Sequence, residues 1–521
     1  MLDHVNPVLI KELRQMVRSR SLVVSLLFFL GALMAMSAGM LALASSSAAK
    51  NAVPDGLPVG MICFFIVYGF LGFITTLVIP FSVLNRIARE REPGRADLQY
   101  STPLPPRAFV DGKALCGAAT GAFFVFAALP FMLLAYLLRG VGLGMIAGAA
   151  VSSVLGAAIL SYVAILFGAT KWSPLAKRVA FFLALYFGGG NFASGIFALF
   201  AISAFSTAAA SGTVAAPSSL GIFFSTPNAQ SLVALVALVC VVCFAFAWYV
   251  RAFAISLLTP VNFNRARPVR QAEATIWFAS LVVLSFAVNL PDGGNILQFW
   301  AGFWVLVFGV RMLMSVSMPR GYSRRVRSEI SGVRFRRVFQ YPVFDGGENG
   351  VVFHLLMGLA TLAAVTALRP FAIVFSHATA TSSTPIERTR EILGVIAVFW
   401  FYLAFYALVC RAIWCRFLVG RVRPARIGLV AFVVFGLASV IPTFFIAMQA
   451  NTPAHDAQEV AGAIGFFGNA AGAAYGLFEN IPQAIWRHLL FSTIAFAVAV
   501  ALWIPALLRS VRDFKPNGNA T

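Results

Sequence analysis

The sequence predicts an all-α, polytopic membrane protein, and three observations carry this prediction. Of the 521 residues, 60% are hydrophobic and only 11% are charged, whereas soluble globular domains carry about 25% charged residues. Mean hydropathy is high, at +0.87. Apolar runs recur along the chain, and each is long enough to cross the ~30 Å hydrocarbon layer of a bilayer as a helix.

We expect about twelve spans, arranged as a helical bundle in two halves of six. The predicted spans cover residues 22–44, 59–84, 114–138, 142–168, 179–206, 231–250, 275–290, 296–314, 351–374, 392–412, 428–448 and 488–509. The segment 449–487 is expected to be external or re-entrant, because a thirteenth span would move the basic C-terminal residues to the other side. A polar, basic stretch at 262–274 separates the halves, which share no convincing sequence repeat.

The distribution of positive charge predicts the orientation. If the N-terminus is cytoplasmic, 33 of the 39 Lys and Arg residues fall in cytoplasmic segments and 6 fall outside. This is the bias that the positive-inside rule describes, so the net charge of +21 needs no nucleic-acid partner. We therefore expect a multi-pass protein of the cytoplasmic (inner) membrane, with both termini cytoplasmic.

The N-terminal segment predicts an interfacial helix before the first span. Asn6 is suited to cap a helix and Pro7 to occupy its first position. Apolar residues then recur at helical spacing and basic residues fall largely on other faces. The apolar set is Leu9, Ile10, Leu13, Met16 and Val17. An amphipathic helix of this kind lies in the headgroup region of the membrane, either as a simple anchor or as an additional contact for a cytoplasmic partner.

The loop that follows the second predicted span is polar and carries both signs of charge. Glu90 and Glu92 stand close to Arg89 and Arg95, so ion pairs can support a short helix. Pro93-Gly94 interrupts that helix, Asp97 can begin another, and the prolines from Pro103 onward stiffen the backbone. From the residue types alone, the loop is either a stiff elbow that transmits force or a solvated connector carrying orienting charge.

Two sequence motifs resemble those of the permeases of type-2 ABC exporters. Residues Asn6 to Arg14 match the Asn-Pro-Val-Leu-x-Lys-Glu-Leu-Arg interfacial helix of that family. The loop resembles the family's Glu-Arg-Glu-x-Gly segment and the Pro-Leu and Gly-Lys pairs after it. Its matching residues are Glu90, Arg91, Glu92, Gly94, Leu98, Pro103, Leu104, Gly112 and Lys113. The loop departs from the family at Pro93, at Arg95, where Thr is usual, and at Asp97, where Glu is usual.

This resemblance covers residues 1 to about 260 and implies a function. It identifies the chain as the transmembrane permease subunit of an export system that is driven by a separate ATP-binding cassette ATPase. It implies a six-span transmembrane domain at 1–261 and leaves the role of a second one, 262–521, undefined. The coupling elbow that seats on the ATPase would comprise Glu90, Glu92, Gly94, Asp97, Pro103 and Leu104. The permease would act alone, as a homodimer or with a second permease.

Other motifs bear on the alternatives. No phosphate-binding G-x-x-x-x-G-K-[ST] loop occurs, so we expect no ATP hydrolysis, catalytic residue, cofactor or metal in this chain. A membrane enzyme acting on a lipid or lipid-linked substrate would need clustered acids and histidines, for which Asp345, Glu348 and His354 are the candidates. A secondary transporter would need buried carboxylates, and all 18 acidic residues are expected at span ends or in loops.

The basic segment 320–337 has three interpretations. Its arginines can simply orient the chain, bind anionic lipid headgroups, or form a second elbow for the ATPase, in which Phe344-Asp345-Gly346 offers a docking turn.

Overall fold

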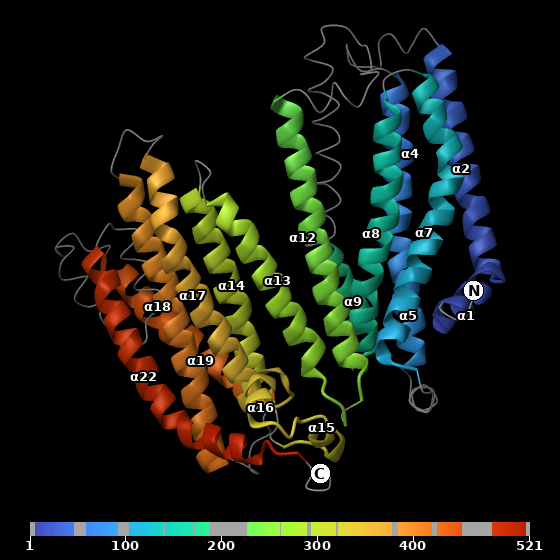
Figure 1. The fold of residues 1–521 in the computed structure, drawn as a ribbon. Coiled ribbons are helices and arrows are strands. Elements are labelled where there is room, and N and C mark those ends of the chain that lie inside the picture. Colours follow the sequence, from blue (N-terminus) through green and yellow to red (C-terminus); the bar gives the residue numbers. More distant parts are fainter. Residues whose placement is uncertain are drawn as a thin grey trace. The chain divides into compact units, whose positions relative to one another are not determined.

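The protein is described here by a computed structural model. It describes residues 6–45, 59–91, 104–138, 141–170, 172–186, 227–260, 262–288, 293–318, 321–377, 384–418, 425–450 and 482–516. Helices are the regular secondary structure of the described residues, and the chain divides into two compact units, Met1–Pro260 and Val261–Thr521 (Figure 1).

Unit 1 consists of a short N-terminal helix followed by long apolar helices. Its elements are α1 (Pro7–Val17), α2 (Arg20–Ser45), α4 (Val59–Phe73), the π-helical turn η1 (Ile74–Val78), α5 (Ile79–Glu90), α7 (Pro106–Leu137), α8 (Leu143–Ala169), α9 (Pro174–Ala184) and α12 (Pro227–Leu258). The segments α4, η1 and α5 form one continuous rod. This rod packs against α7 and α8, and α8 also packs against α9 and α12.

Unit 2 has long helices and a short helical segment between two of them. Its elements are α13 (Ala266–Ala287), α14 (Gly293–Val316), α15 (Arg324–Ser328), α16 (Arg334–Gln340), the 3-10 turn η3 (Tyr341–Val343), α17 (Gly347–His377), α18 (Thr384–Ile413), the π-helical turn η4 (Trp414–Leu418), α19 (Ala425–Ala450) and α22 (Pro482–Asp513). α14 packs against α17 and α18, and α18 also packs against α19 and α22.

The two units repeat one order of helix packing, although no sequence repeat was found. In unit 1, the rod of α4, η1 and α5 contacts α7 and α8, and α8 contacts α9 and α12. In unit 2, α14 contacts α17 and α18, and α18 contacts α19 and α22. The units differ in one respect, because α7 and α8 pack extensively whereas α17 and α18 touch only lightly. The Trp400 side chain of α18 lies directly against Gly358 of α17. A methyl group added at position 358 would lie 2.0 Å from the indole ring.

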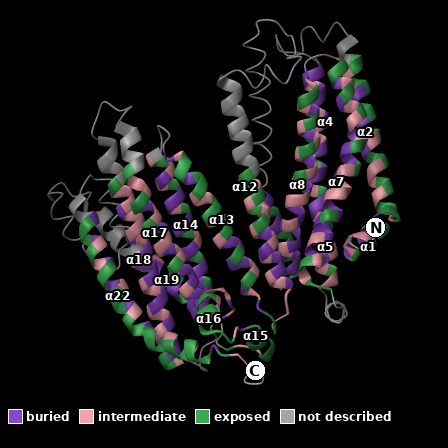
Figure 2. Ribbon diagram, viewed as in Figure 1, coloured by how far each residue is buried: buried purple, intermediate pink, exposed green. Residues whose placement is uncertain are grey.

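The long helices have the length and composition of membrane spans. Among the described residues, nine helices are long and apolar enough to cross a bilayer, so the chain is a polytopic membrane helical bundle. Their buried residues gather where helices of one unit face each other (Figure 2). Large apolar side chains remain exposed on the outer faces, for example Phe28, Phe126, Phe286 and Phe299. Such continuous apolar surface is what a helix presents to lipid.

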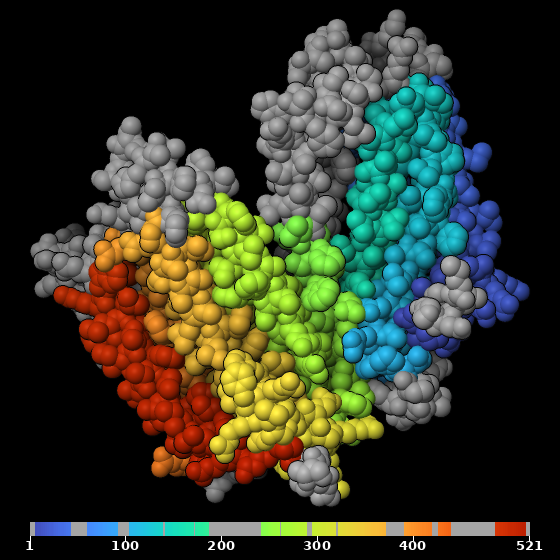
Figure 3. Space-filling view, in the orientation of Figure 1, coloured from blue at the N-terminus to red at the C-terminus, as the bar shows by residue number. Residues whose placement is uncertain are grey.

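The segment between α14 and α17 forms a small folded layer at one end of unit 2. Val326, Ile330, Tyr341 and Phe344 bury their side chains around Phe514, which follows α22. Figure 3 shows the residues of α15 and α16 (yellow) on the surface of this unit. Phe335 and Phe339 of α16 are largely exposed and contact each other edge to face.

Candidate functional site

The N-terminal helix begins as its sequence predicts. The Asn6 side-chain oxygen accepts a hydrogen bond from the Val8 backbone N–H at 3.0 Å, and Pro7 occupies the first helical position. The same Asn6 side chain also donates through Nδ2 to the Ala108 carbonyl of α7, at 2.5 Å. The cap therefore does two things, because it starts α1 and ties it to the helix that follows the predicted elbow.

The face by which α1 packs on α7 contains only one residue of the predicted apolar set, Met16. Val8, Glu12 and Met16 are buried at four-residue intervals, whereas Val17 is 57% exposed. Leu9, Ile10 and Leu13 are only half-buried. The amphipathic pattern is thus confirmed, but the protein contact is made by a row that contains a carboxylate. The other four residues of the apolar set remain partly or largely exposed, and their position in the headgroup region stays a prediction.

Glu12 belongs to an ionic cluster formed by Glu12, Arg86, Glu90 and Lys113. Lys113 Nζ donates to Glu12 Oε1 at 2.6 Å and to Glu90 Oε1 at 2.8 Å, and Arg86 lies 3.7 Å from the other Glu12 oxygen. The Lys113 side chain is only 3% exposed. Such a pair adds little net stability once desolvation is counted, but losing one partner strands a buried charge and costs about 3–5 kcal/mol. The ionic cluster therefore holds α1, α5 and α7 in one arrangement.

Gly112 permits the close approach of α1 to α7. A methyl group at this position would lie 2.9 Å from Val8 Cβ and 3.1 Å from Asn6 Nδ2, which is closer than real Cβ contacts. Each residue of the Gly112-Lys113 motif thus has a structural role. The glycine admits α1, and the lysine pairs with its carboxylate.

Arg91 ties the end of α5 to two other helices. Its guanidinium donates to the Leu257 carbonyl of α12 at 3.0 Å and to the Ala169 carbonyl of α8 at 3.4 Å. These carbonyls lie in the last turns of their helices, where no intrahelical donor remains and a cation is favourable. The chain therefore enters the predicted elbow from an anchored helix end.

The structure places two of the six predicted elbow residues. Glu90 ends α5 within the ionic cluster. Leu104 lies two residues before α7 and is 40% exposed. The other four, Glu92, Gly94, Asp97 and Pro103, lie outside the described residues. The described residues thus show how the two ends of the loop are held.

Sequence reasoning missed an ion pair between α7 and α12. Asp111 accepts two hydrogen bonds from Arg251, both at 2.6 Å, and a third from the Tyr162 hydroxyl of α8 at 3.3 Å. The two charges are 140 residues apart in the chain. Both residue types stood at predicted span ends, so the signal was present, but nothing in the sequence indicated that they meet.

The expectation that the chain has no buried carboxylate beside its spans is wrong for unit 2. Glu273 has no exposed side chain, and it accepts from Arg311 of α14 at 2.6 Å and contacts His354 of α17 at 3.2 Å. Glu348 is buried against Arg411, whose guanidinium also donates to the Val316 and Met318 carbonyls. The prediction failed because α13 begins at Ala266, well before the predicted span, and carries Glu273 into the helix packing.

The candidate residues for a membrane enzyme are not brought together. Glu348 faces Arg411 and His354 faces Glu273 and Ser315, whereas the Asp345 side chain accepts from the Gly346 backbone. Each of the three side chains thus has a different set of partners. No group of three or more His, Cys, Asp or Glu residues with a metal-binding arrangement occurs in the described part of the chain.

Comparison with protein-family models, curated proteins and solved structures finds no match to this chain. The resemblance to the exporter permeases therefore rests on the motif residues of the sequence alone.

Proposed function

We propose that this protein is the transmembrane permease subunit of an ATP-driven export system whose ATPase is a separate protein. One observation carries the proposal. The motif residues come from three separate stretches of sequence, and in the structure Asn6, Glu12, Glu90, Gly112 and Lys113 join in one contact network. A network of this kind is suited to coupling, because a push on the loop between α5 and α7 acts on three helices together.

The mechanism follows from this arrangement. An ATPase that closes on nucleotide moves the elbow at 86–113, and Glu90 and Lys113 within it convey the movement to α5, α7 and α1. The bundle then changes between two packings, one open to each side of the membrane. The proposal includes the predicted orientation, in the cytoplasmic membrane with both termini cytoplasmic, since only then does the elbow face a cytoplasmic ATPase.

The repeated packing order supports a role for unit 2 as a second transmembrane domain of six spans. The segment 317–346 follows the second long helix of unit 2, as the predicted elbow follows the second spanning rod of unit 1. Its ends are also clamped by a buried ion pair, in this case Glu348 with Arg411. We propose that the segment 317–346 is the second elbow of a chain that carries both halves of a permease.

Co-expression of the tagged chain with the proteins encoded by the neighbouring genes tests the proposal. We expect an ATP-binding cassette protein to co-purify with it, and Glu92→Lys to reduce recovery of that ATPase at least tenfold. Glu459→Lys is the matched control, because it makes the same charge change in the segment predicted to lie outside. The proposal fails if no cassette protein is recovered, or if labelling from outside the cell reaches a cysteine placed at position 92.

The buried Glu273 group favours a second candidate function, an ion-coupled secondary transporter. A carboxylate with no exposed surface beside a histidine and an arginine is the kind of group that proton-coupled carriers use. This candidate is favoured over the first if transport stops when the proton gradient is abolished while ATP is maintained. Transport should then also be lost in Glu273→Gln.

A further inference from the structure

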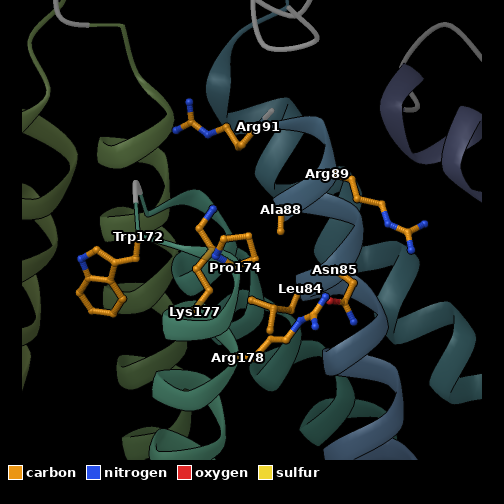
Figure 4. A pocket seen from close by; sticks show the side chains of 9 residues that line it. All are labelled: Leu84, Asn85, Ala88, Arg89, Arg91, Trp172, Pro174, Lys177 and Arg178. Carbon is orange, nitrogen blue, oxygen red and sulfur yellow. The ribbon is translucent and has the colours of Figure 1, made fainter. Parts of the chain in front are cut away.

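A pocket of about 370 Å³ lies in unit 1 between the end of α5 and the start of α9. Figure 4 shows the side chains that line it. Four of the nine lining residues are cationic, namely Arg89, Arg91, Lys177 and Arg178, and none is acidic. The remaining lining is apolar or uncharged, and includes the indole of Trp172.

Lys177 is the most unusual of these cations, because it is buried and meets no counterion among the described residues. The residue is 7% exposed, and its Nζ donates to the Gly168 carbonyl at 3.1 Å. It forms no ion pair with any carboxylate of the described residues. Burial, with a smaller contribution from the positive charge of Arg91, lowers the pKa of the Lys177 ammonium. The folded protein therefore bears an electrostatic cost at this point.

Comparison with Lys113 shows that Lys177 lacks a carboxylate partner among the described residues. Both lysines are buried in unit 1, but Lys113 meets two carboxylates whereas Lys177 meets a carbonyl and a second cation. The terminal carbonyls of α8 offset part of the charge. A carbonyl dipole cannot neutralise a full charge, and burial of an ion without a counterion is unfavourable. An anion in the pocket would supply the absent partner.

We propose that this pocket binds a phosphate group, and that the group belongs to an anionic lipid. The surroundings favour the lipid source. Trp172 is half-exposed beside the pocket, and tryptophan is enriched at the level of the headgroups. The next residues of α9, including Leu175, Val179 and Phe182, present exposed apolar side chains on which an acyl chain can lie. Free phosphate shares the chemistry of the headgroup but makes no use of this apolar surface.

The experiment measures the thermal unfolding of the purified full-length protein in detergent. The additions are phosphatidylglycerol, phosphatidylcholine and inorganic phosphate, each in a separate series. We expect phosphatidylglycerol to raise the melting temperature and phosphatidylcholine to leave it unchanged. The Lys177→Gln/Arg178→Gln variant should lose at least half of the rise. The control, Arg509→Gln/Arg512→Gln, removes two exposed charges from unit 2 and should keep it.

A second variant separates a binding site from a merely structural lysine. Without lipid, Lys177→Met should melt at the temperature of the wild type or above it, because it removes an uncompensated charge and retains the length of the side chain. It should also fail to respond to phosphatidylglycerol. The proposal is overturned if both variants keep the full response, or if phosphatidylcholine stabilises the wild type equally. A response to inorganic phosphate that equals the lipid response supports the site but assigns it to a free anion. None of these measurements requires the ATPase, so they stand apart from the proposed export function.

Discussion

At the scale of single residues, the ionic cluster has a buried centre, formed by Lys113 and Glu12, and two more exposed members, Arg86 and Glu90. Lys113 pairs with two carboxylates from different helices, and one of them, Glu12, lies 101 residues earlier in the chain. Glu12 is largely shielded from solvent, so its charge depends on Lys113 more than the charge of Glu90 does. The position of Lys113 next to Gly112 lets α1 come near enough for the pair to form.

Removal of Lys113 tests this arrangement. We expect Lys113→Met to destabilise unit 1 by up to about 3–5 kcal/mol, because the buried Glu12 keeps only the more distant Arg86 and Glu90 loses its bond to Lys113. Unfolding in detergent at pH 7 is the measurement, and Arg14→Met, on the exposed side of α1, is the control. The double variant Lys113→Met/Glu12→Leu should recover part of the loss. If Lys113→Met is as stable as the wild type, the ion pairs that Lys113 makes with Glu12 and Glu90 do not stabilise unit 1.

Gly112 makes a second prediction at this scale. Gly112→Ala should weaken the docking of α1, because its methyl group meets Val8 and Asn6. Gly144→Ala, in α8, is the matched control, since nothing lies within 4 Å of its position and alanine favours the helix by up to about 1 kcal/mol. Amide exchange in α1 should quicken in the first variant only. Equal amide exchange rates of α1 in the two variants would contradict the steric explanation.

At the scale of elements, α1 is a docked helix rather than a free anchor. Its one strong local signal is the Asn6 cap, and its tertiary contacts are the row of Val8, Glu12 and Met16. An isolated helix of 11 residues is marginal in water, so packing on α7 supplies most of its stability. A push on α7 is therefore also felt by α1.

The cap residue separates local from tertiary stabilisation. Asn6→Ala should cost about 1 kcal/mol through the lost cap, and more through the lost bond to Ala108. In α9 the corresponding cap is Ser173, whose hydroxyl oxygen accepts a hydrogen bond from the Ala176 backbone N–H. Ser173→Ala removes this cap and should affect α9 alone. Exchange rates of the first-turn amides of both helices report the two effects. Equal losses at the two sites would indicate that the Ala108 bond adds nothing.

At the scale of the whole molecule, each unit contains its own apolar core. The core clusters of unit 1 and those of unit 2 share no residue, and the chain divides at Pro260. Expression of residues 1–260 and 261–521 as two chains should therefore give two proteins that each insert and resist proteolysis without the other. Degradation of either half when expressed alone would show that its fold depends on the other.

Much of the helical architecture could be predicted because it depends on local properties. An apolar run long enough to cross the bilayer must pair its own backbone groups, so the sequence alone determined the polytopic helical class. The same holds for the start of α1, because Asn6 and Pro7 act on neighbouring backbone groups. Of the twelve predicted spans, the structure shows nine helices of sufficient length and apolar character among its described residues, and the rest stay predictions.

Only the tertiary structure decided which charges meet. Glu12 finds Lys113, Asp111 finds Arg251 and Glu273 finds Arg311 across 101, 140 and 38 residues. Such pairs form where helices pack, and packing depends on side-chain shape along whole helices rather than on any short pattern. The same reason explains why Lys177 resembled an ordinary orienting charge in the sequence. Its burial beside Arg91, and the pocket around both, arise only when α5, α8 and α9 come together.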